Sequence, residues 1–209
     1  MAEGDVWISK FFLDSRYVRE LTVDWDAPGW REVAQKRSPP PETLPLPAYA
    51  VYRDDTLQDL PPVFCGGGGV NVCPAMADVF RRFDLVAGGP SKGGVFPIQL
   101  FLHGQSTPAR ADYSVLVYGG YKEGGLIPEE SKGLRAGKYA SNPPERWMLS
   151  EIKDGDIAVR AAVREGSDFW FDQKLQSGVF MSDRLVQALK DTGLAQHFSP
   201  IRCRVVELH

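Results

Sequence analysis

Glycine and proline are concentrated in the first two thirds of this chain. Of its 209 residues, 21 are Gly and 16 are Pro, and 32 of these 37 lie in residues 1–144. Glycine raises the entropic cost of regular structure and proline removes a backbone donor, so this density disfavours helical bundles, coiled coils and helical solenoids. We therefore expect two regions, a loop-rich α+β region over residues 1–144 and a more regular α+β unit over residues 145–209, packed as one globular body.

Short apolar runs along the whole chain predict strands. The candidates are residues 6–13, 17–25, 49–53, 95–102, 113–117, 147–152, 157–163, 169–171 and 201–208. We expect the second of these to pair with the first. The turn signal at residues 153–156 predicts a hairpin between its two flanking strands.

Two segments predict helices. Residues 74–86 place apolar side chains on one face, and residues 183–192 follow a good N-cap, Ser182, and end before Gly193. Five prolines in residues 39–47 predict an extended, exposed segment. The fold class is therefore α+β, with mixed and antiparallel sheets, few short helices and long Gly/Pro-rich loops.

Two stretches of the chain share one pattern of apolar residues. The first stretch has apolar residues at 63–64, a predicted helix around 79–83 and a predicted strand that begins at 96–98. The second has the same features in the same order, at 179–180, 185–189 and 198–201. In this alignment Val79 corresponds to Leu185. The pattern predicts a two-fold repeat of a strand-helix-strand unit.

Composition limits the class of partner and compartment. The formal net charge of −3 argues against general binding to nucleic acid, which needs Lys and Arg in excess. Three Cys residues are too few for a disulfide framework, and no apolar run approaches the roughly 20 residues of a membrane span. The first 13 residues lack the pattern of a secretory signal. We expect a cytoplasmic protein with no membrane or nucleic-acid partner.

The glycine run at residues 66–69 is the clearest candidate for a ligand loop. It lacks the Gly-Lys-Ser/Thr ending of a phosphate loop and the third glycine of a dinucleotide fingerprint. We interpret it as a flexible insertion ahead of a helix. The alternative, an enzyme or small-molecule-binding domain that uses Gly66 to Asn71 with Cys65, Cys73 or His103, stays open.

Other candidate reactive groups have structural interpretations. The spacings of Cys and His match no zinc pattern, and Cys203 lies at an apolar position of a predicted strand. Asp154 and Asp156 could pair as general acid and base, but around Gly155 they are the residues expected in a turn. We predict no metal site, no cofactor and no catalytic set, and hence no enzyme.

A Gly-rich segment, residues 119–144, is the predicted contact region for a protein partner. We expect a long mobile excursion there, which could be trimmed over residues 121–142 without loss of the fold. Aromatic side chains anchor many protein interfaces, and charged ones give complementarity. The predicted partner-binding residues are Tyr118, Tyr121, Glu123, Glu129, Glu130 and Tyr139.

The C-terminal third resembles a known family. The resemblance depends on three features: the run Ser-Gly-Val-Phe-Met-Ser-Asp-Arg-Leu at residues 177–185, a helix that ends in Gly-Leu, and an aromatic residue followed by Ser-Pro-Ile at 198–201. They resemble a bacterial family of immunity-like proteins found beside toxin genes in polymorphic toxin and contact-dependent systems, most closely over residues 147–208. The resemblance implies a protein that binds a cognate toxin, such as a nuclease, and neutralises it by stoichiometric occlusion. These are packing motifs, so the resemblance carries over no catalytic residues.

Overall fold

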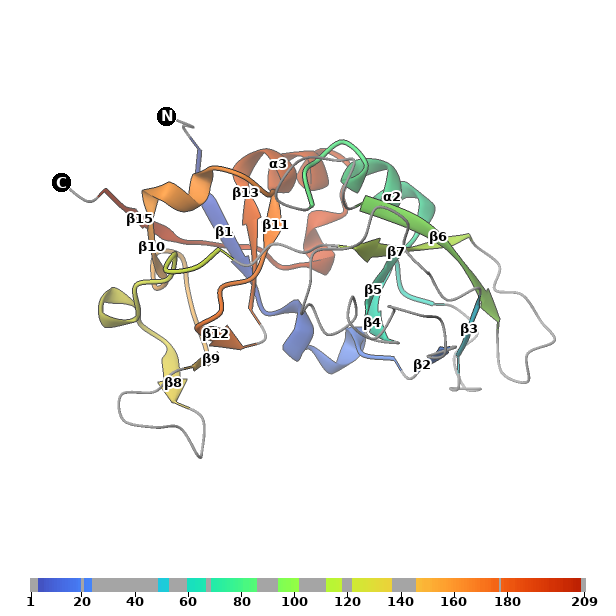
Figure 1. Cartoon of the computed structure of the whole chain (residues 1–209), viewed down its shortest axis with the longest axis horizontal. Coiled ribbons are helices and arrows are strands. Elements are labelled where there is room, and N and C mark those ends of the chain that lie inside the picture. The colour runs from blue at the N-terminus through green and yellow to red at the C-terminus, as the bar shows by residue number, and fades with distance from the viewer. Residues whose placement is uncertain are drawn as a thin grey trace. The chain divides into compact units, whose positions relative to one another are not determined.

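A computed structural model gives the arrangement of the chain (Figure 1). It describes residues 4–19, 21–23, 49–52, 60–66, 69–85, 94–101, 112–117, 122–136, 146–176 and 178–207. The chain forms two compact units, of which unit 1 contains Met1–Leu13 and Gly120–His209 and unit 2 contains Asp14–Gly119. The change of composition at residue 144 therefore does not coincide with the limit of a unit. Residues 39–47 lie outside the described part.

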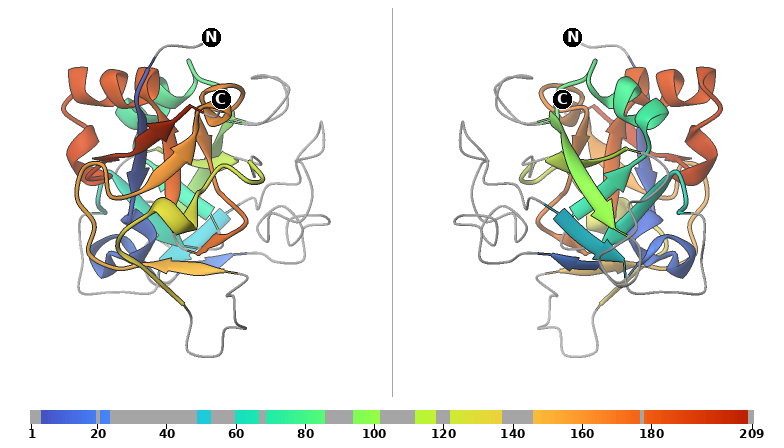
Figure 2. Two further views of the ribbon diagram at one scale, coloured as in Figure 1. Left: turned by 90° about the vertical axis from the view of Figure 1, so that its left-hand side faces the viewer. Right: turned by 90° about the vertical axis from the view of Figure 1, so that its right-hand side faces the viewer.

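Unit 1 is built on a four-stranded antiparallel sheet. Its order is β11 (Phe169–Trp170), β13 (Val179–Ser182), β1 (Val6–Ser9) and β14 (Ile201–Arg202). Ile8 of β1 lies opposite Phe180 on one side and Ile201 on the other. The N-terminal strand is therefore enclosed by strands from the C-terminal third, as Figure 2 shows for the blue strand and its red neighbours.

Helix α3 (Asp183–Asp191) covers one face of this sheet, where it packs against β13 and β1. Trp7 lies on that face, because its indole Nε1 donates to Asp183 Oδ1 at 2.9 Å and the Lys190 ammonium lies 4.1 Å from its ring centre. Val6 and Ile8 alternate with Trp7 and point to the opposite face, as strand periodicity requires.

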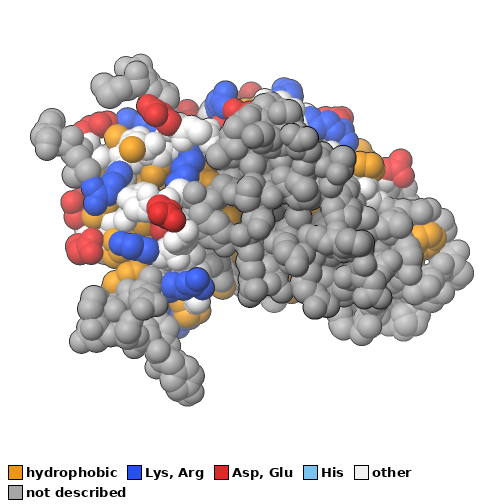
Figure 3. Space-filling view, viewed as in Figure 1, with side chains coloured by type: hydrophobic (Ala, Val, Ile, Leu, Met, Phe, Trp, Pro, Cys, Tyr) orange, Lys and Arg blue, Asp and Glu red, His pale blue; other side chains and the backbone are white. Residues whose placement is uncertain are grey.

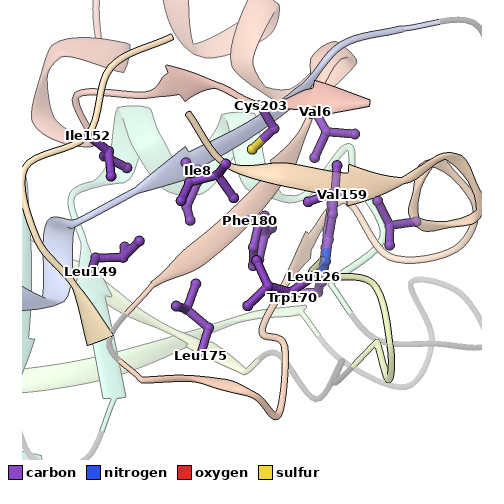
Figure 4. Packing of buried hydrophobic residues seen from close by; sticks show 12 residues of the cluster. Val6, Ile8, Leu126, Leu149, Ile152, Val159, Trp170, Leu175, Phe180 and Cys203 are labelled. Carbon is purple, nitrogen blue, oxygen red and sulfur yellow. The ribbon is translucent and has the colours of Figure 1, made fainter. Parts of the chain in front are cut away.

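Two small sheets and their connections lie on that opposite side. One pairs β10 (Ala158–Arg160) in parallel with β15 (Arg204–Val206), and the other has the order β12 (Leu175–Gln176), β9 (Trp147–Leu149), β8 (Leu134–Ala136). The core contains Val6, Ile8, Leu126, Leu149, Ile152, Ile157, Val159, Val163, Trp170, Leu175, Phe180 and Cys203 (Figure 4). Burial of these apolar side chains is the main force that holds unit 1 together.

Short 3-10 turns connect many of these elements. They are η1 (Phe11–Leu13), η2 (Ser15–Tyr17), η3 (Pro128–Glu130), η4 (Ala161–Arg164) and η5 (Ala195–His197). All of them except η2 belong to unit 1. Neither of the two described α-helices has the length and apolar character that a membrane crossing demands.

Unit 2 contains a six-stranded mixed sheet. Its order is β2 (Leu21–Val23), β3 (Tyr49–Tyr52), β6 (Gly94–Phe101), β7 (Tyr113–Val117), β5 (Gly69–Val72) and β4 (Val63–Gly66). Only β3 and β6 run parallel, and the other neighbours are antiparallel. Helix α2 (Pro74–Phe80) packs against β6 and β7. The expected α+β class, with few short helices, is confirmed.

The two units share one arrangement of strands. In unit 2, β4 and β5 are followed by α2 and β6, and β7 lies between β5 and β6; in unit 1, β11 and β13 are followed by α3 and β14, and β1 lies between β13 and β14. All neighbours in both four-stranded sets are antiparallel. The strand enclosed between two others differs in its place along the chain. In unit 2 this strand, β7, comes after the other elements of the arrangement, and in unit 1 it is β1, which comes before them. The predicted repeat is therefore present, as a repeated order and direction of strands around one helix.

The residue alignment predicted for this repeat is wrong. Residues 63–64 belong to β4, which corresponds to the edge strand β11, while the strand before the helix is β5. The misalignment arises because the glycine run joins β4 to β5. When the N-caps Cys73 and Ser182 are superposed, the buried residues Met76, Ala77 and Phe80 align with Leu185, Val186 and Leu189. The predicted correspondence of Val79 with Leu185 is thus displaced by three positions.

Three local predictions need correction. Strand β2, in the segment 17–25, pairs with β3, whereas the partners of β1 are β13 and β14. The turn at 153–156 forms, with Gly155 at φ 80°, but β9 and β10 pair with other strands. Helix α2 ends at Phe80, because the next backbone N–H groups, from Arg82 and Phe83, bond three residues back and tighten the last turn.

Helix α3 confirms both of its predicted ends. Ser182 Oγ accepts from the backbone N–H of Leu185, as an N-cap does. Gly193 has φ 72°, and the N–H groups of Gly193 and Leu194 donate to the carbonyls of Lys190 and Leu189 at 2.9 and 2.8 Å. These two hydrogen bonds form the Schellman motif, which gives partners to backbone carbonyls that would otherwise be left without them at the end of a helix.

Candidate functional site

An acidic 3-10 turn, η3, presents two of the predicted partner-binding residues. Glu129 and Glu130 are exposed on this turn, and the neighbouring Leu126 and Ile127 are buried. Hydrogen bonds fix it to β10: Ile127 N donates to Ala158 O at 2.9 Å, and Ala158 N donates to Ser131 Oγ at 2.9 Å. We call η3 with these two carboxylates the acidic turn.

The acidic turn is also tied to β15. Arg204 donates from Nη1 to Glu130 Oε2 at 2.9 Å and from Nη2 to the Glu130 carbonyl at 2.6 Å. Both side chains are about half exposed, at 46% and 47%. The pair therefore adds little stability by itself, but it fixes the direction of one carboxylate on a rigid turn.

The remaining predicted contact residues divide into two groups. Glu123 is exposed, and its Oε1 accepts from Gln173 Nε2 at 2.8 Å. Tyr118, Tyr121 and Tyr139 lie outside the described residues. The structure therefore places only the three acidic members of the predicted set.

The expected mobile excursion is wrong for residues 122–136. They contain β8 and η3, bury Leu126 and Ile127, and donate backbone hydrogen bonds from Lys122 and Lys132 to Phe171 and Asp156. Lysine and glutamate in this stretch suggested a solvated loop, but its apolar residues complete the core of unit 1. The segment is an integral part of the fold.

An open, polar pocket lies at the end of unit 1 where β14 passes into β15. Its volume is about 370 Å³, and it is lined by Asp5, Asp154, Gly155, Arg164, Arg202, Cys203, Arg204 and Val205. Figure 3 shows basic and acidic side chains interspersed at the end of unit 1 that carries β10 and β15. We call this the arginine pocket.

The three arginines of the pocket differ in how firmly they are held. Arg164 donates to the Gly4 carbonyl and to Glu207 Oε1, both at 2.9 Å, and Arg204 is held by Glu130. Arg202 Nη1 lies 3.7 Å from Asp5 Oδ2, too far for a charge-assisted hydrogen bond. Among the described residues this ion pair is the only polar contact of the Arg202 side chain. Arg202 is therefore the most available cation of the pocket.

The turn at residues 153–156 supports the floor of the pocket. Asp154 Oδ1 accepts from the backbone N–H of Arg202 at 2.9 Å, and Asp156 Oδ2 accepts from Lys153 N at 2.8 Å. Asp156 therefore stabilises the turn from within, as the sequence interpretation expected, and Asp154 joins the turn to β14. Cys203 is 4% exposed and belongs to the core, and burial raises the pKa of its thiol well above the ordinary value. The thiolate needed for reaction is disfavoured there.

The two described glycines of the run, Gly66 and Gly69, lie in paired antiparallel strands. Gly66 at the end of β4 lies opposite Gly69 at the start of β5, and buried Asn71 donates from Nδ2 to the Gly66 carbonyl at 3.3 Å. The interpretation as a flexible insertion is therefore wrong for these residues, since both glycines are paired in the sheet. Cys65 and Cys73 are half-buried and in no disulfide among the described residues, and His103 lies outside those residues.

Sequence reasoning missed a buried polar cluster beside Trp170. The Lys122 ammonium donates to the carbonyls of Val163 and Ser167 at 2.7 and 2.9 Å and lies 3.5 Å from the centre of the Trp170 ring. Burial lowers the pKa of Lys122 to about 8, and the Asp168 carboxylate acts in the opposite direction. Two carbonyl acceptors and one aromatic ring face thus hold this partly buried lysine.

Two buried carboxylates flank the aromatic strand β11. Asp168 accepts both Nε and Nη2 of Arg184 at 2.6 Å and also the Ser182 hydroxyl, and Asp172 accepts the backbone N–H groups of Leu126 and Lys174 at 2.8 Å. Buried charges need such partners. The sequence carried only a weak signal, because Asp168 and Asp172 bracket the apolar run 169–171 but carboxylates are ordinarily exposed.

Comparison with models of protein families finds no match for this chain, and comparison with curated proteins finds none either. Among the described residues, no group of three or more His, Cys, Asp or Glu side chains is arranged to hold a metal ion. The two surface features present opposite charges: the acidic turn presents carboxylates, and the arginine pocket presents guanidinium donors.

Proposed function

We propose that this protein is an immunity-type inhibitor that binds a cognate toxin protein and occludes its working surface stoichiometrically. The observation that carries the proposal is the acidic turn, which presents exposed carboxylates on a rigid, hydrogen-bonded scaffold. Rigid charged surfaces speed association and select partners by complementarity. The resemblance of residues 147–208 to immunity-like proteins supports the same function.

A nuclease is the class of toxin that best fits the acidic turn. An enzyme that binds a phosphate backbone carries Lys and Arg on its substrate surface. The carboxylates of Glu129 and Glu130 would pair with such a surface and exclude the nucleic acid. The binding should weaken as salt is added, because exposed ion pairs are screened.

The test is co-expression with the product of the neighbouring gene, scored by growth, together with binding measured on the purified proteins. We expect the neighbour to be toxic alone and harmless with this protein. Glu129→Lys should weaken the affinity about tenfold or more, because it places a cation against a basic surface.

The matched control is Glu165→Lys, which reverses an exposed carboxylate on a different loop of unit 1. It should leave growth and affinity unchanged. A neighbour that stays toxic in the presence of this protein would refute the inhibitor function. Equal effects of the two substitutions would show that the acidic turn is not the contact.

A further inference from the structure

We propose that the arginine pocket is a binding site for a compact oxyanion, a phosphate or a carboxylate group. The pocket is open and has room for such a group with part of its hydration, and three guanidinium groups line it together with the carboxylates of Asp5 and Asp154. Two further carboxylates, those of Glu130 and Glu207, already pair with Arg204 and Arg164. Arginine recognises both kinds of oxyanion through paired N–H donors. This site is separate in its chemistry from the acidic turn, which attracts cations.

The backbone sets the arginines around the pocket. Arg202 and Arg204 flank Cys203, and alternation along an extended chain sends the buried Cys203 side chain inward and the two arginines outward. Cys203 N donates to the Val6 carbonyl at 2.7 Å, and Arg204 N donates to the Ile157 carbonyl at 2.7 Å. The backbone between the two arginines is therefore fixed from both sides.

Arg164 and Arg204 are preorganised by the contacts that they already make. Each is held by one carbonyl oxygen and one carboxylate, and each guanidinium carries five N–H donors. Such anchoring reduces the side-chain entropy that a ligand must overcome on binding. Their remaining donors provide the fixed wall of the site.

Arg202 provides the available donors. Its side chain is 53% exposed, and its contact with Asp5 is a 3.7 Å ion pair without a hydrogen bond. An incoming oxyanion competes only with this loose contact. Asp154, the other carboxylate of the pocket, already accepts the backbone N–H of Arg202, which reduces its repulsion of a ligand.

The experiment follows the arginine Nε–Hε signals by NMR while inorganic phosphate, and separately acetate, is titrated into the full chain. Sodium chloride keeps the ionic strength constant and serves as the blank. We expect a saturable shift of the Arg202 signal with a millimolar dissociation constant. The probe that binds more tightly identifies the source of the oxyanion as phosphate or carboxylate.

Two variants make the test specific. Arg202→Ala should weaken binding about tenfold, the loss expected for one charge-assisted contact. Asp5→Asn removes the competing carboxylate and should tighten binding. Arg135→Ala, an exposed arginine on β8 outside the pocket, is the control that should change nothing. Because Arg202 is exposed and lies outside the core, the variant should keep the wild-type fold, checked by the same spectra.

Non-saturable shifts for both probes that equal the chloride blank would overturn the proposal. So would saturable binding that persists unchanged in Arg202→Ala. Neither result bears on the inhibitor function, which is tested through the toxin and the acidic turn.

Discussion

Unit 1 and unit 2 each contain four strands and one helix in the same arrangement, but different contacts stabilise the helix in each unit. Helix α3 of unit 1 has nine residues, a hydroxyl N-cap and a Schellman end. Helix α2 of unit 2 has seven residues, and its N-cap, Cys73, makes no side-chain cap bond. The feature that both helices share is the burial of one face, so this burial, and not the caps, accounts for the common topology. The buried residues are Met76, Ala77 and Phe80 in α2 and Leu185, Val186 and Leu189 in α3.

The connections between equivalent strands differ more than the strands do. In unit 2, β4 and β5 are separated by two residues, whereas the corresponding connection from β11 to β13 in unit 1 includes β12 and the buried carboxylate of Asp172. Unit 1 also has residues 122–136 packed into its core, from the segment after unit 2. The additions that distinguish this unit therefore lie in its connections, and they carry the acidic turn.

The largest effect is expected on replacing residues 122–136 with a flexible Gly-Ser linker. This change removes Leu126 and Ile127 from the core and Lys122 from its two carbonyl acceptors, so we expect unit 1 to lose its cooperative fold. Near-ultraviolet circular dichroism and urea unfolding measure the loss. The charge variants Glu123→Gln and Glu129→Gln in the same segment should fold normally. A cooperative transition at the wild-type urea midpoint would show that the segment is dispensable.

A smaller effect is expected at the two N-caps. Cys73→Ser should give α2 the cap that α3 already has, and should raise the free energy of unfolding by about 1 kcal/mol relative to Cys73→Ala. Ser182→Ala should lower it by about 1–2 kcal/mol, because Ser182 also donates to Asp168. Urea denaturation monitors both. If Cys73→Ser and Cys73→Ala were equally stable, the N-cap would not be what distinguishes the two helices.

A pH-dependent effect is expected at the Lys122 cluster, formed by Lys122, Trp170 and the carbonyls of Val163 and Ser167. The folded-state pKa of Lys122, about 8, lies below the ordinary value of 10.5. Between these pH values the unfolded chain binds more protons, so stability should rise with pH there relative to Lys122→Met. Urea midpoints of both proteins from pH 7 to 10.5 test this. A flat difference would mean that the two carbonyls, Trp170 and Asp168 keep the ammonium charged throughout.

Local signals predicted what is locally determined. Ser182 and Gly193 mark α3 because caps act within one turn, and Gly155 marks its turn because it adopts positive φ. The partners of β1 could not be predicted in this way, since they lie at least 170 residues further along the chain. The turn at 153–156 suggested a hairpin because it lies between two strands, but those strands, β9 and β10, pair with strands elsewhere in the chain, which no local signal indicates.

The candidate site was predicted only in part. Exposed glutamates in a Gly-rich stretch indicated the acidic turn, although the rigidity of that turn depends on contacts with β10 and β15. The arginine pocket brings together the N-terminal Asp5, the turn at Asp154 and the last strands. Alternation of Arg202, Cys203 and Arg204 was visible in the sequence, but the third arginine, Arg164, joins them only through the fold.

The most direct test of the shared topology is a set of cross-strand backbone NOEs in the full chain. We expect contacts from Ile8 to Phe180 and to Ile201 on its two sides, and from Val115 to Asn71 and to Phe96 on its two sides. These would place β1 and β7 at equivalent positions between two antiparallel neighbours. Contacts from Ile8 to residues 21–23 in place of Phe180 would show that the two units do not share this topology.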